Sequence, residues 1–199
     1  PKREFRAPLP IPEVFVDGRR LQAARWPNEG WATIEKFVDP GTKNSDGGVF
    51  SSLGNAKKAR LQPRGGVFGY TGDRPARWVN APNVWLHGFW CFDWYDSVIP
   101  VAAVNAASNT IALACPHTYG VRRGNPSPRR WRVEHLLEEL DAPGEYYVDA
   151  DAKKLYLIPP QPLTAASRVV LVDSSRSLVR LEKAANVVFR DIDFTECHA

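Results

Sequence analysis

The segment from Pro143 to Pro160 constrains the fold of this chain most strongly, because it predicts a strand, a polar turn and a second strand that ends at a double proline. Asp149 and Asp151 frame the turn, where aspartates commonly bond neighbouring backbone amides, and Glu145 is expected at the strand edge. The 199 residues include 17 prolines and 14 glycines, which indicates many turns and short elements. We therefore expect a mainly β fold.

Other segments predict short strands joined by tight turns. Within residues 14–21, Asp17 and Gly18 supply a turn that permits positive φ. Residues 83–97 are rich in tryptophan, and both faces of the predicted strand are apolar, so we expect it to be covered on both sides. Residues 98–114 predict two strands with a polar turn between them.

One helix is predicted, near residues 132–141. Its apolar positions follow the spacing i, i+3, i+4 and i+7, which places them on a single stripe. The members of this stripe are Val133, Leu136, Leu137 and Leu140. Glu138 and Glu139 lie off the stripe and are expected to face solvent, while Pro143 ends the helix because it lacks the amide hydrogen.

The C-terminal segment predicts short strands at 169–172, 178–181 and 186–194. The apolar phase slips within the last strand, and a left-handed bend at Asp191 would accommodate the slip. Strand, bend and strand form the corner of one coil of a parallel β-helix, which needs a following coil to cover its apolar side chains. The side chains expected to pack inward are Val187, Phe189, Ile192 and Phe194.

The charge pattern gives no support for nucleic acid binding. The formal net charge is +4, a mild excess spread over scattered arginines. We expect the densest run to be a solvated loop, since no zinc finger, RNP signature or basic recognition helix accompanies it. This run consists of Arg122, Arg123, Arg129, Arg130 and Arg132.

Metal, cofactor and membrane signals are equally weak. Cys91, Cys115 and Cys197 are far apart without CxxC spacing; buried free thiols are expected, although one disulfide stays open. The four histidines are isolated and no phosphate-binding loop is present, so neither a metal site nor a cofactor is expected. No apolar run approaches the ~20 residues of a membrane helix. Because the chain begins at Pro1 and not at methionine, we expect an excised domain or a processed chain.

Tryptophans and aspartates are the candidates for ligand contact. Trp31 and Trp94 lie next to loops, where a flat ring could pack on the C–H face of a sugar, whereas core packing is the simpler role for the mid-strand Trp85 and Trp90. Paired carboxylates beside aromatic residues can serve glycoside hydrolysis, although such aspartates more often bond turn amides. The predicted substrate contacts are Trp31, Trp94, Asp93 and Asp96, and no catalytic residue is assigned.

Four ordered groups of segments, spread over roughly residues 13–197, resemble secreted right-handed parallel β-helix proteins that include several glycoside hydrolase families. The segments are Val14-Phe-Val-Asp-Gly-Arg-Arg with Ala24-Arg-Trp-Pro-Asn28, Val84-Trp-Leu-His-Gly-Phe-Trp with Asp93-Trp94, residues 136–149, and Leu155-Tyr-Leu-Ile-Pro-Pro160. The resemblance implies a β-rich domain inserted near the start of a β-helix. It also implies an extracellular or periplasmic protein acting on polysaccharides, with catalytic carboxylates on coils beyond this chain.

The expected organisation is therefore a linker at 1–12, a compact β-barrel-like or sandwich-like domain at 13–165 with one short helix, and an incomplete first part of a parallel β-helix at 166–199. In this interpretation the chain supports or walls the substrate cleft of a glycoside hydrolase and is inactive in isolation. The alternative is a non-catalytic carbohydrate-binding or structural module. Either way, the expected partner is a poly- or oligosaccharide.

Overall fold

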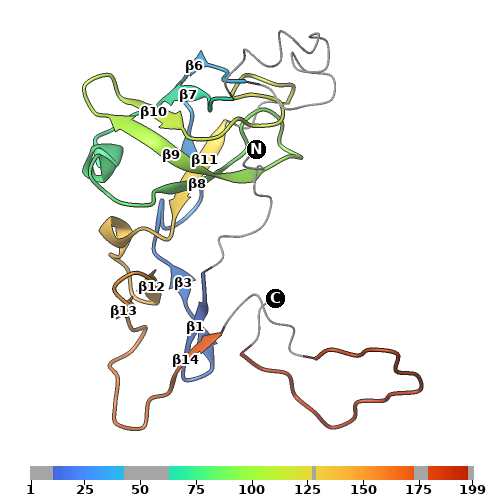
Figure 1. Ribbon diagram of the computed structural model, residues 1–199. Helices are drawn as coiled ribbons and strands as arrows, with labels where there is room; N and C mark the ends of the chain where they lie inside the picture. The colour runs from blue at the N-terminus through green and yellow to red at the C-terminus, as the bar shows by residue number, and fades with distance from the viewer. Residues whose placement is uncertain (1–10, 43–62, 127–128, 173–178, 197–199) are drawn as a thin grey trace. The chain divides into compact units, whose positions relative to one another are not determined.

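The computed structural model describes residues 11–42, 63–126, 129–172 and 179–196. The described chain forms two compact units, one from residues 24–139 and the other from residues 11–23 with 140–196. Both units are mainly β with mostly antiparallel strand pairing (Figure 1). The only helices among the described residues are two short 3-10 turns, η1 (Arg74–Trp78) and η2 (Leu137–Glu139).

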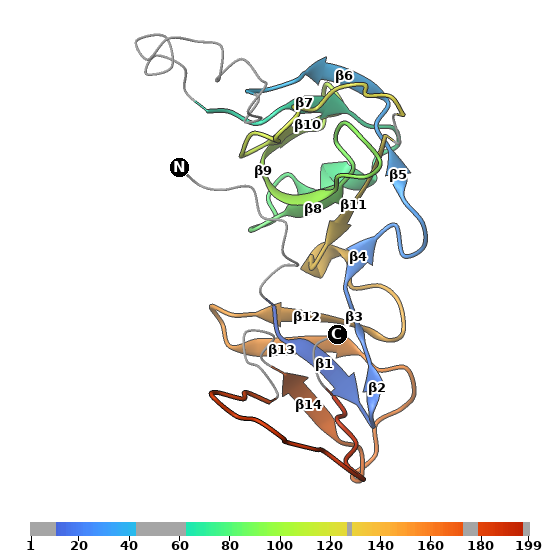
Figure 2. The same ribbon diagram turned by 90° about the vertical axis from the view of Figure 1, so that its right-hand side faces the viewer.

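The first unit is built on one eight-stranded sheet. Its strands are β4 (Arg25–Trp26), β5 (Ala32–Thr33), β6 (Lys36–Asp39), β7 (Val67–Gly69), β8 (Trp85–Gly88), β9 (Ser97–Asn105), β10 (Thr110–Leu113) and β11 (Arg130–Glu134). The strand order is β4-β11-β8-β9-β10-β7-β6, and β5 also pairs with β11. Only two residues separate β5 from β6. This one segment therefore pairs with β11 near one end of the strand order and with β7 near the other. The sheet therefore curls round on itself (Figure 2).

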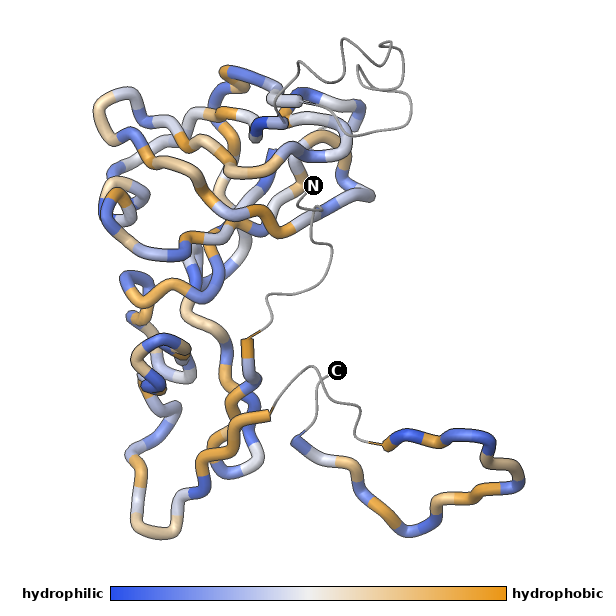
Figure 3. Tube along the Cα trace, in the orientation of Figure 1, coloured by the Kyte–Doolittle hydropathy of each residue, from blue (hydrophilic) through white to orange (hydrophobic). Residues whose placement is uncertain are grey.

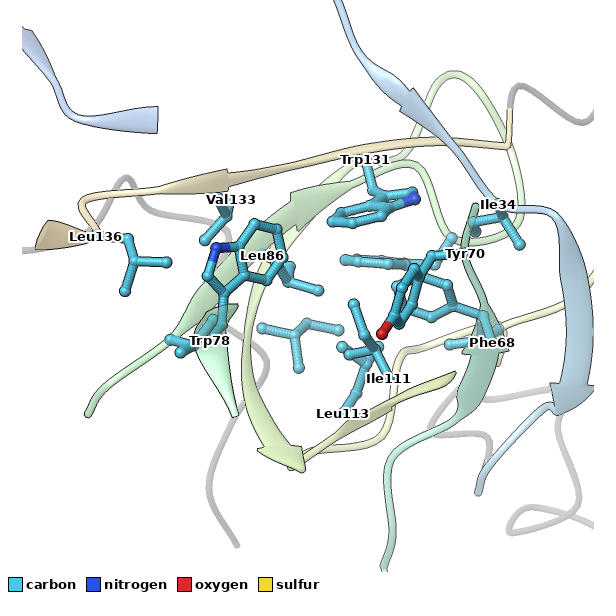
Figure 4. Close-up of a cluster of buried hydrophobic side chains, with 14 residues drawn as sticks. Ile34, Phe68, Tyr70, Trp78, Leu86, Ile111, Leu113, Trp131, Val133 and Leu136 are labelled. Carbon is cyan, nitrogen blue, oxygen red and sulfur yellow. The ribbon is translucent and has the colours of Figure 1, made fainter. Parts of the chain in front are cut away.

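The concave side of this sheet encloses a core rich in aromatic rings. Trp78, Trp90 and Trp131 are each at most 1% exposed, and Figure 4 shows Trp78 and Trp131 pointing into one cluster with Phe68. The rings of Trp78 and Trp131 meet edge to face with centroids 6.1 Å apart. Trp90 thus has the predicted core position, whereas Trp85 lies half-buried on the opposite face of β8. That second face is only partly covered, less than the sequence predicted.

The predicted helix at 132–141 is wrong. Trp131 and Val133 are buried at alternate positions of β11, and the chain then takes a left-handed conformation at His135, with φ of 54°. Only the 3-10 turn η2 follows, and it leaves Leu137 39% exposed. Val133 fits both the apolar spacing of a helix and the two-residue alternation of a strand. The segment forms a strand because it pairs with β8.

The prediction that Glu139 faces solvent is also wrong. Its side chain is fully buried and accepts a hydrogen bond of 2.6 Å from the indole nitrogen of Trp78. Arg74 donates to the other carboxylate oxygen at 2.7 Å. The carboxylate therefore ties η1 to η2, which a solvated glutamate would not do. Glu138, the preceding residue, is half-buried.

The second unit has two small sheets. Their strands are β1 (Glu13–Val16), β2 (Arg19–Arg20) and β14 (Val169–Val172) in one, and β3 (Gln22–Ala23), β12 (Glu145–Asp149) and β13 (Lys154–Ile158) in the other. Asp17 and Gly18 have positive φ of 49° and 76°, which confirms the predicted turn between β1 and β2. A small core joins the two sheets, and its fully packed members are Val14, Val16, Leu21 and Tyr146.

The hairpin predicted from residues 143–160 is confirmed as β12 and β13, which pair in register from Glu145 with Ile158 to Asp149 with Lys154. Asp149 accepts a hydrogen bond of 2.8 Å from the amide of Ala152, as turn chemistry predicted. The expected edge position of Glu145 is wrong, because its side chain is buried and its strand, β12, is the central one of the sheet. The carboxylate accepts hydrogen bonds from the amides of residues 141 and 142, both at 3.1 Å. These carboxylates hold the backbone of the hairpin in place.

The C-terminal segment differs from its prediction. Strand β14 forms where predicted, but it pairs antiparallel with β1. The predicted bend at Asp191 is present, with φ of 57°. Residues 179–196 nevertheless contain no strand, so the start of a parallel β-helix is not seen. Figure 3 shows apolar stretches along this segment, and the side chains expected to pack inward are exposed: Val187, Phe189, Ile192 and Phe194.

Some predictions concern residues outside the described ranges. These are most of the linker at 1–12, part of the strand at 178–181, and Cys197. Cys91 is a buried free thiol, as expected, and Cys115 is free and half-buried. The predicted domain division at 1–12, 13–165 and 166–199 stays a prediction.

Candidate functional site

The connection between β8 and β9, residues 89–96, carries three exposed side chains, those of Asp93, Trp94 and Asp96. Neighbouring backbone holds it in place: the amide of Arg122 donates to the carbonyl of Trp90 at 3.1 Å, and the amide of Phe89 donates to the carbonyl of Arg130 at 2.9 Å. A Cβ atom on Gly124 would lie 2.2 Å from the carbonyl oxygen of Cys91, so this close approach requires glycine. The loop is therefore fixed along much of its length.

The first feature is an exposed indole ring, that of Trp94, supported by three less exposed aromatic rings. We call this group the Trp94 platform and define it as Trp94, Phe92, Tyr95 and Tyr119. Trp94 is 62% exposed. Its ring stacks on Phe92 with centroids 5.2 Å apart and 14° between planes. Tyr95 and Tyr119 meet the Trp94 ring edge-on at 5.8 Å and 5.6 Å. Three rings thus hold the indole while leaving much of it open to solvent.

The second feature is an open hollow of about 540 Å³, which we call the arginine hollow. Its lining residues are Phe92, Arg122, Arg123, Gly124, Asn125 and Arg129. No carboxylate contributes to this lining. Arg122 is positioned by its own Nε, which donates to the carbonyl of Tyr119 at 2.8 Å. Arg123 is exposed, and Arg122 and Arg129 are half-buried, so the predicted solvated run is only partly solvated.

The third feature is a group of charged and aromatic side chains on the outer face of β8 and β11, which we call the His87 network. It consists of His87, Asp96, Glu134, Arg132 and Trp31. The two carboxylates contact opposite nitrogens of the imidazole, Asp96 at 2.7 Å from Nε2 and Glu134 at 3.2 Å from Nδ1. Arg132 donates to Glu134 at 2.5 Å and lies over the ring of Trp31 at 4.4 Å. Each charged side chain of the network therefore contacts a group of opposite charge when His87 is protonated.

Electrostatics favours the charged forms within the His87 network. Burial lowers the pKa of His87, but the hydrogen bonds that its ring donates to the carboxylates of Glu134 and Asp96 outweigh burial, and the net pKa is raised. Burial raises the pKa of Glu134, but His87 and Arg132 together hold it below its usual value. The network is therefore an ion-paired surface assembly, and its imidazole is occupied on both nitrogens.

The predicted contact residues divide between these features. Trp94 forms the Trp94 platform, and Asp93 is exposed beside it in the same turn. Trp31 and Asp96 belong to the His87 network. Asp96 points its carboxylate at His87, so the two predicted aspartates do not act as a matched pair in this arrangement.

Sequence reasoning missed the residues that support the site. Phe92 and Tyr119 lie 27 positions apart, and no periodic pattern connects them, yet their rings meet at 5.2 Å. The sequence predicts the arginine run as a solvated loop, whereas three of its arginines line the hollow. The proximity of this run to aromatic residues in the same loop region was the available signal.

The described ranges contain neither a candidate metal site nor a membrane-spanning helix. There, no group of three or more His, Cys, Asp or Glu side chains could hold a metal ion. None of the helices described there is long and apolar enough to cross a membrane.

Comparisons with known proteins find a weak structural likeness and no match by sequence. No known protein family and no curated protein matches this sequence. A solved structure titled "Glycoside hydrolase" superposes with a TM-score of 0.49 at 19% sequence identity. The match covers 83% of this chain and 27% of that chain, so this chain spans about a quarter of the solved protein's length. A superposition this weak carries no inference about activity, and function must be argued from the site itself.

Proposed function

We propose that the first unit binds carbohydrate on the Trp94 platform and serves as a non-catalytic part of a carbohydrate-active protein. One observation carries the proposal: Trp94 is 62% exposed although its ring is stacked on Phe92 and fixed by two tyrosines. Leaving so much of a large apolar ring in water forgoes the stabilisation that its burial would give. A ring held rigidly in that exposed position can serve as a contact surface.

The chemistry of the platform suits a sugar. A pyranose ring presents a flat face of C–H groups that packs on an indole, and its hydroxyls require polar partners at the edges. Asp93 is exposed next to Trp94 and can accept hydrogen bonds from such hydroxyls. Because Phe92, Tyr95 and Tyr119 already hold the indole, little side-chain entropy is lost on binding.

The wider setting rests on the family resemblance of the sequence. It supports the proposal that the parent is a secreted or periplasmic β-helix glycoside hydrolase whose acid pair lies outside this chain. The chain then contributes a wall or a subsite of the cleft. A purely structural insert is the competing role, and it differs in one respect: it requires no saccharide affinity.

Titration calorimetry of the full chain against xylan, galactan and fucan oligosaccharides tests the proposal. We expect Trp94→Ala to weaken binding at least about tenfold, or about 1.4 kcal/mol, and Trp94→Phe to retain part of the affinity. Val79→Ala is the matched control, because it shortens another exposed apolar side chain of this unit (47% exposed) that lies outside the platform.

Trp31→Ala separates the two aromatic groups of the unit. Trp31 packs edge-on against His87 and is only half-buried, so its removal should leave the affinity within about twofold if the platform is the binding surface. Unchanged affinity in Trp94→Ala, or no binding to any saccharide tested, neutral or charged, would overturn the proposal.

A further inference from the structure

The arginine hollow concentrates positive charge that no carboxylate of the described residues neutralises. Arg122, Arg123 and Arg129 line it, and among the described residues none of the three forms an ion pair. Two other arginines of this unit show the contrast. Arg64 pairs with Asp39, and Arg74 pairs with Glu139. Three like charges around one hollow repel one another, so an anion entering the hollow would relieve that repulsion.

The arginine hollow and the Trp94 platform share their supporting residues. Phe92 lines the hollow and also stacks under Trp94. Tyr119 meets both of these rings, and its carbonyl accepts the Nε hydrogen bond of Arg122. A ligand whose sugar ring rests on Trp94 therefore has guanidinium groups within the same contiguous surface.

We infer that the preferred ligand is an acidic saccharide, with a uronate carboxylate or a sulfate ester seated in the arginine hollow while a neighbouring sugar ring packs on Trp94. This inference rests on the carbohydrate binding proposed above. Guanidinium groups match carboxylate and sulfate oxygens through paired N–H donors. A hollow of about 540 Å³ lies within the ~300–1,000 Å³ range of small-ligand sites.

The same surface argues against a nucleic acid. Single-stranded nucleic acids also combine stacking with positive charge, but they need a basic groove that follows many phosphates. Here the exposed loop carries Asp93 and Asp96 near the Trp94 platform, and the net charge of the chain is only +4. Carboxylates repel a phosphate backbone, whereas they accept hydrogen bonds from sugar hydroxyls.

The test compares four ligands on the full chain: neutral xylo-oligosaccharides, oligogalacturonates of equal length, inorganic sulfate and polyuridylate. We expect oligogalacturonate to bind at least about tenfold more tightly than the neutral oligosaccharide in about 50 mM salt. That preference should shrink to about twofold in about 500 mM salt, because salt screens the charges.

Variants assign the preference to the arginine hollow. Arg123 is exposed and makes no bond within the described fold, so Arg123→Ala should fold normally and lower oligogalacturonate affinity about tenfold, with neutral affinity unchanged. Arg123→Lys should retain most of the affinity and Arg123→Glu should abolish the preference. Lys36→Ala removes one exposed positive charge elsewhere on this unit and should change nothing.

The outcomes separate this inference from the proposed function. Equal affinity for neutral and acidic oligosaccharides, or an Arg123→Ala loss that is the same for both, overturns the acidic preference and leaves carbohydrate binding intact. If inorganic sulfate binds as tightly as oligogalacturonate, the hollow is only an anion site, and the inferred preference for acidic saccharides is also overturned. Tighter binding of polyuridylate than of any saccharide overturns it in favour of nucleic acid. Failure of every saccharide refutes the proposed function itself.

Discussion

Two groups of aromatic rings in the first unit differ in how they are enclosed. The core tryptophans Trp78, Trp90 and Trp131 are at most 1% exposed and are surrounded by other core side chains. Trp78 and Trp90 also place their indole N–H groups on acceptors inside the fold, Glu139 and the carbonyl of Ser97. Trp94 has equally close ring contacts but stays 62% exposed. The candidate site is therefore identified by a tryptophan ring that other rings hold in place but do not cover, and not by the number of aromatic residues.

Removing a core tryptophan should give the largest effect on stability. Trp131 meets Phe68, Trp26 and Trp78, and Trp131→Ala leaves a cavity among them, so we expect a loss of about 3–5 kcal/mol in the free energy of unfolding. Denaturant titration followed by tryptophan fluorescence measures it. Trp131→Phe keeps part of the packing and should cost less than half as much. A loss below about 1 kcal/mol would contradict the assignment of Trp131 to the core.

The buried carboxylate beneath Trp78 should give the next largest effect. Glu139→Ala removes the acceptor of the buried indole N–H of Trp78 and one hydrogen-bonded ion pair of Arg74, which should cost about 3 kcal/mol. Glu138→Ala is the matched control, because it removes the same residue type one position away and should cost less than about 0.5 kcal/mol. Equal losses in the two variants would show that the contacts of Glu139 contribute no net stability.

The sequence predicts those parts of the fold whose signals are local. Asp17 and Gly18 specify their own turn, and residues 143–160 contain both strands of a hairpin and the turn between them. The strand at Arg130–Glu134 was missed because Val133 fits two periods, and the choice depends on pairing with β8, more than 40 positions earlier. Glu139 was misplaced for the same reason, since Arg74 and Trp78 lie 65 and 61 positions away.

The candidate site was predictable only in part. Trp94 was selected because it lies beside a loop, and the structure leaves it exposed. Its support from Tyr119 and the hollow lined by Arg123 depend on two loops meeting in space, which no single segment encodes. Asp96 was selected by its sequence neighbours, but its carboxylate contacts His87. Composition can name candidate side chains, whereas tertiary packing decides which of them share a surface.

A histidine near the core should make stability depend on pH. Burial lowers the pKa of His135 to about 4 from its usual 6.5, so the folded state resists protonation. Between these values the unfolded state binds the additional proton, and stability must fall as pH decreases from about 6.5 toward 4. We expect the stability of the wild type to fall by about 2 kcal/mol more than that of His135→Asn over this range. Asparagine suits the left-handed conformation at this position.

Unfolding curves at several pH values measure this difference directly. Subtracting the curve of His135→Asn from that of the wild type removes the shared contribution of the carboxylates. The same subtraction for His87→Asn should have the opposite slope, because the pKa of His87 is raised and its contribution is lost as pH rises through that value. Parallel curves for wild type and His135→Asn would show that His135 is not shielded from solvent.

The smallest stability effect should come from the most exposed tryptophan. Trp94 buries little of its ring, so Trp94→Ala should change the free energy of unfolding by less than about 1 kcal/mol, far below the cost at Trp131. The same substitution is expected to weaken saccharide binding at least about tenfold. These two results would show that Trp131 serves stability and Trp94 serves binding, although both are tryptophans of the same unit. If Trp94→Ala instead destabilised the unit as much as Trp131→Ala, its ring would be part of the core and the Trp94 platform would lose its meaning as a site.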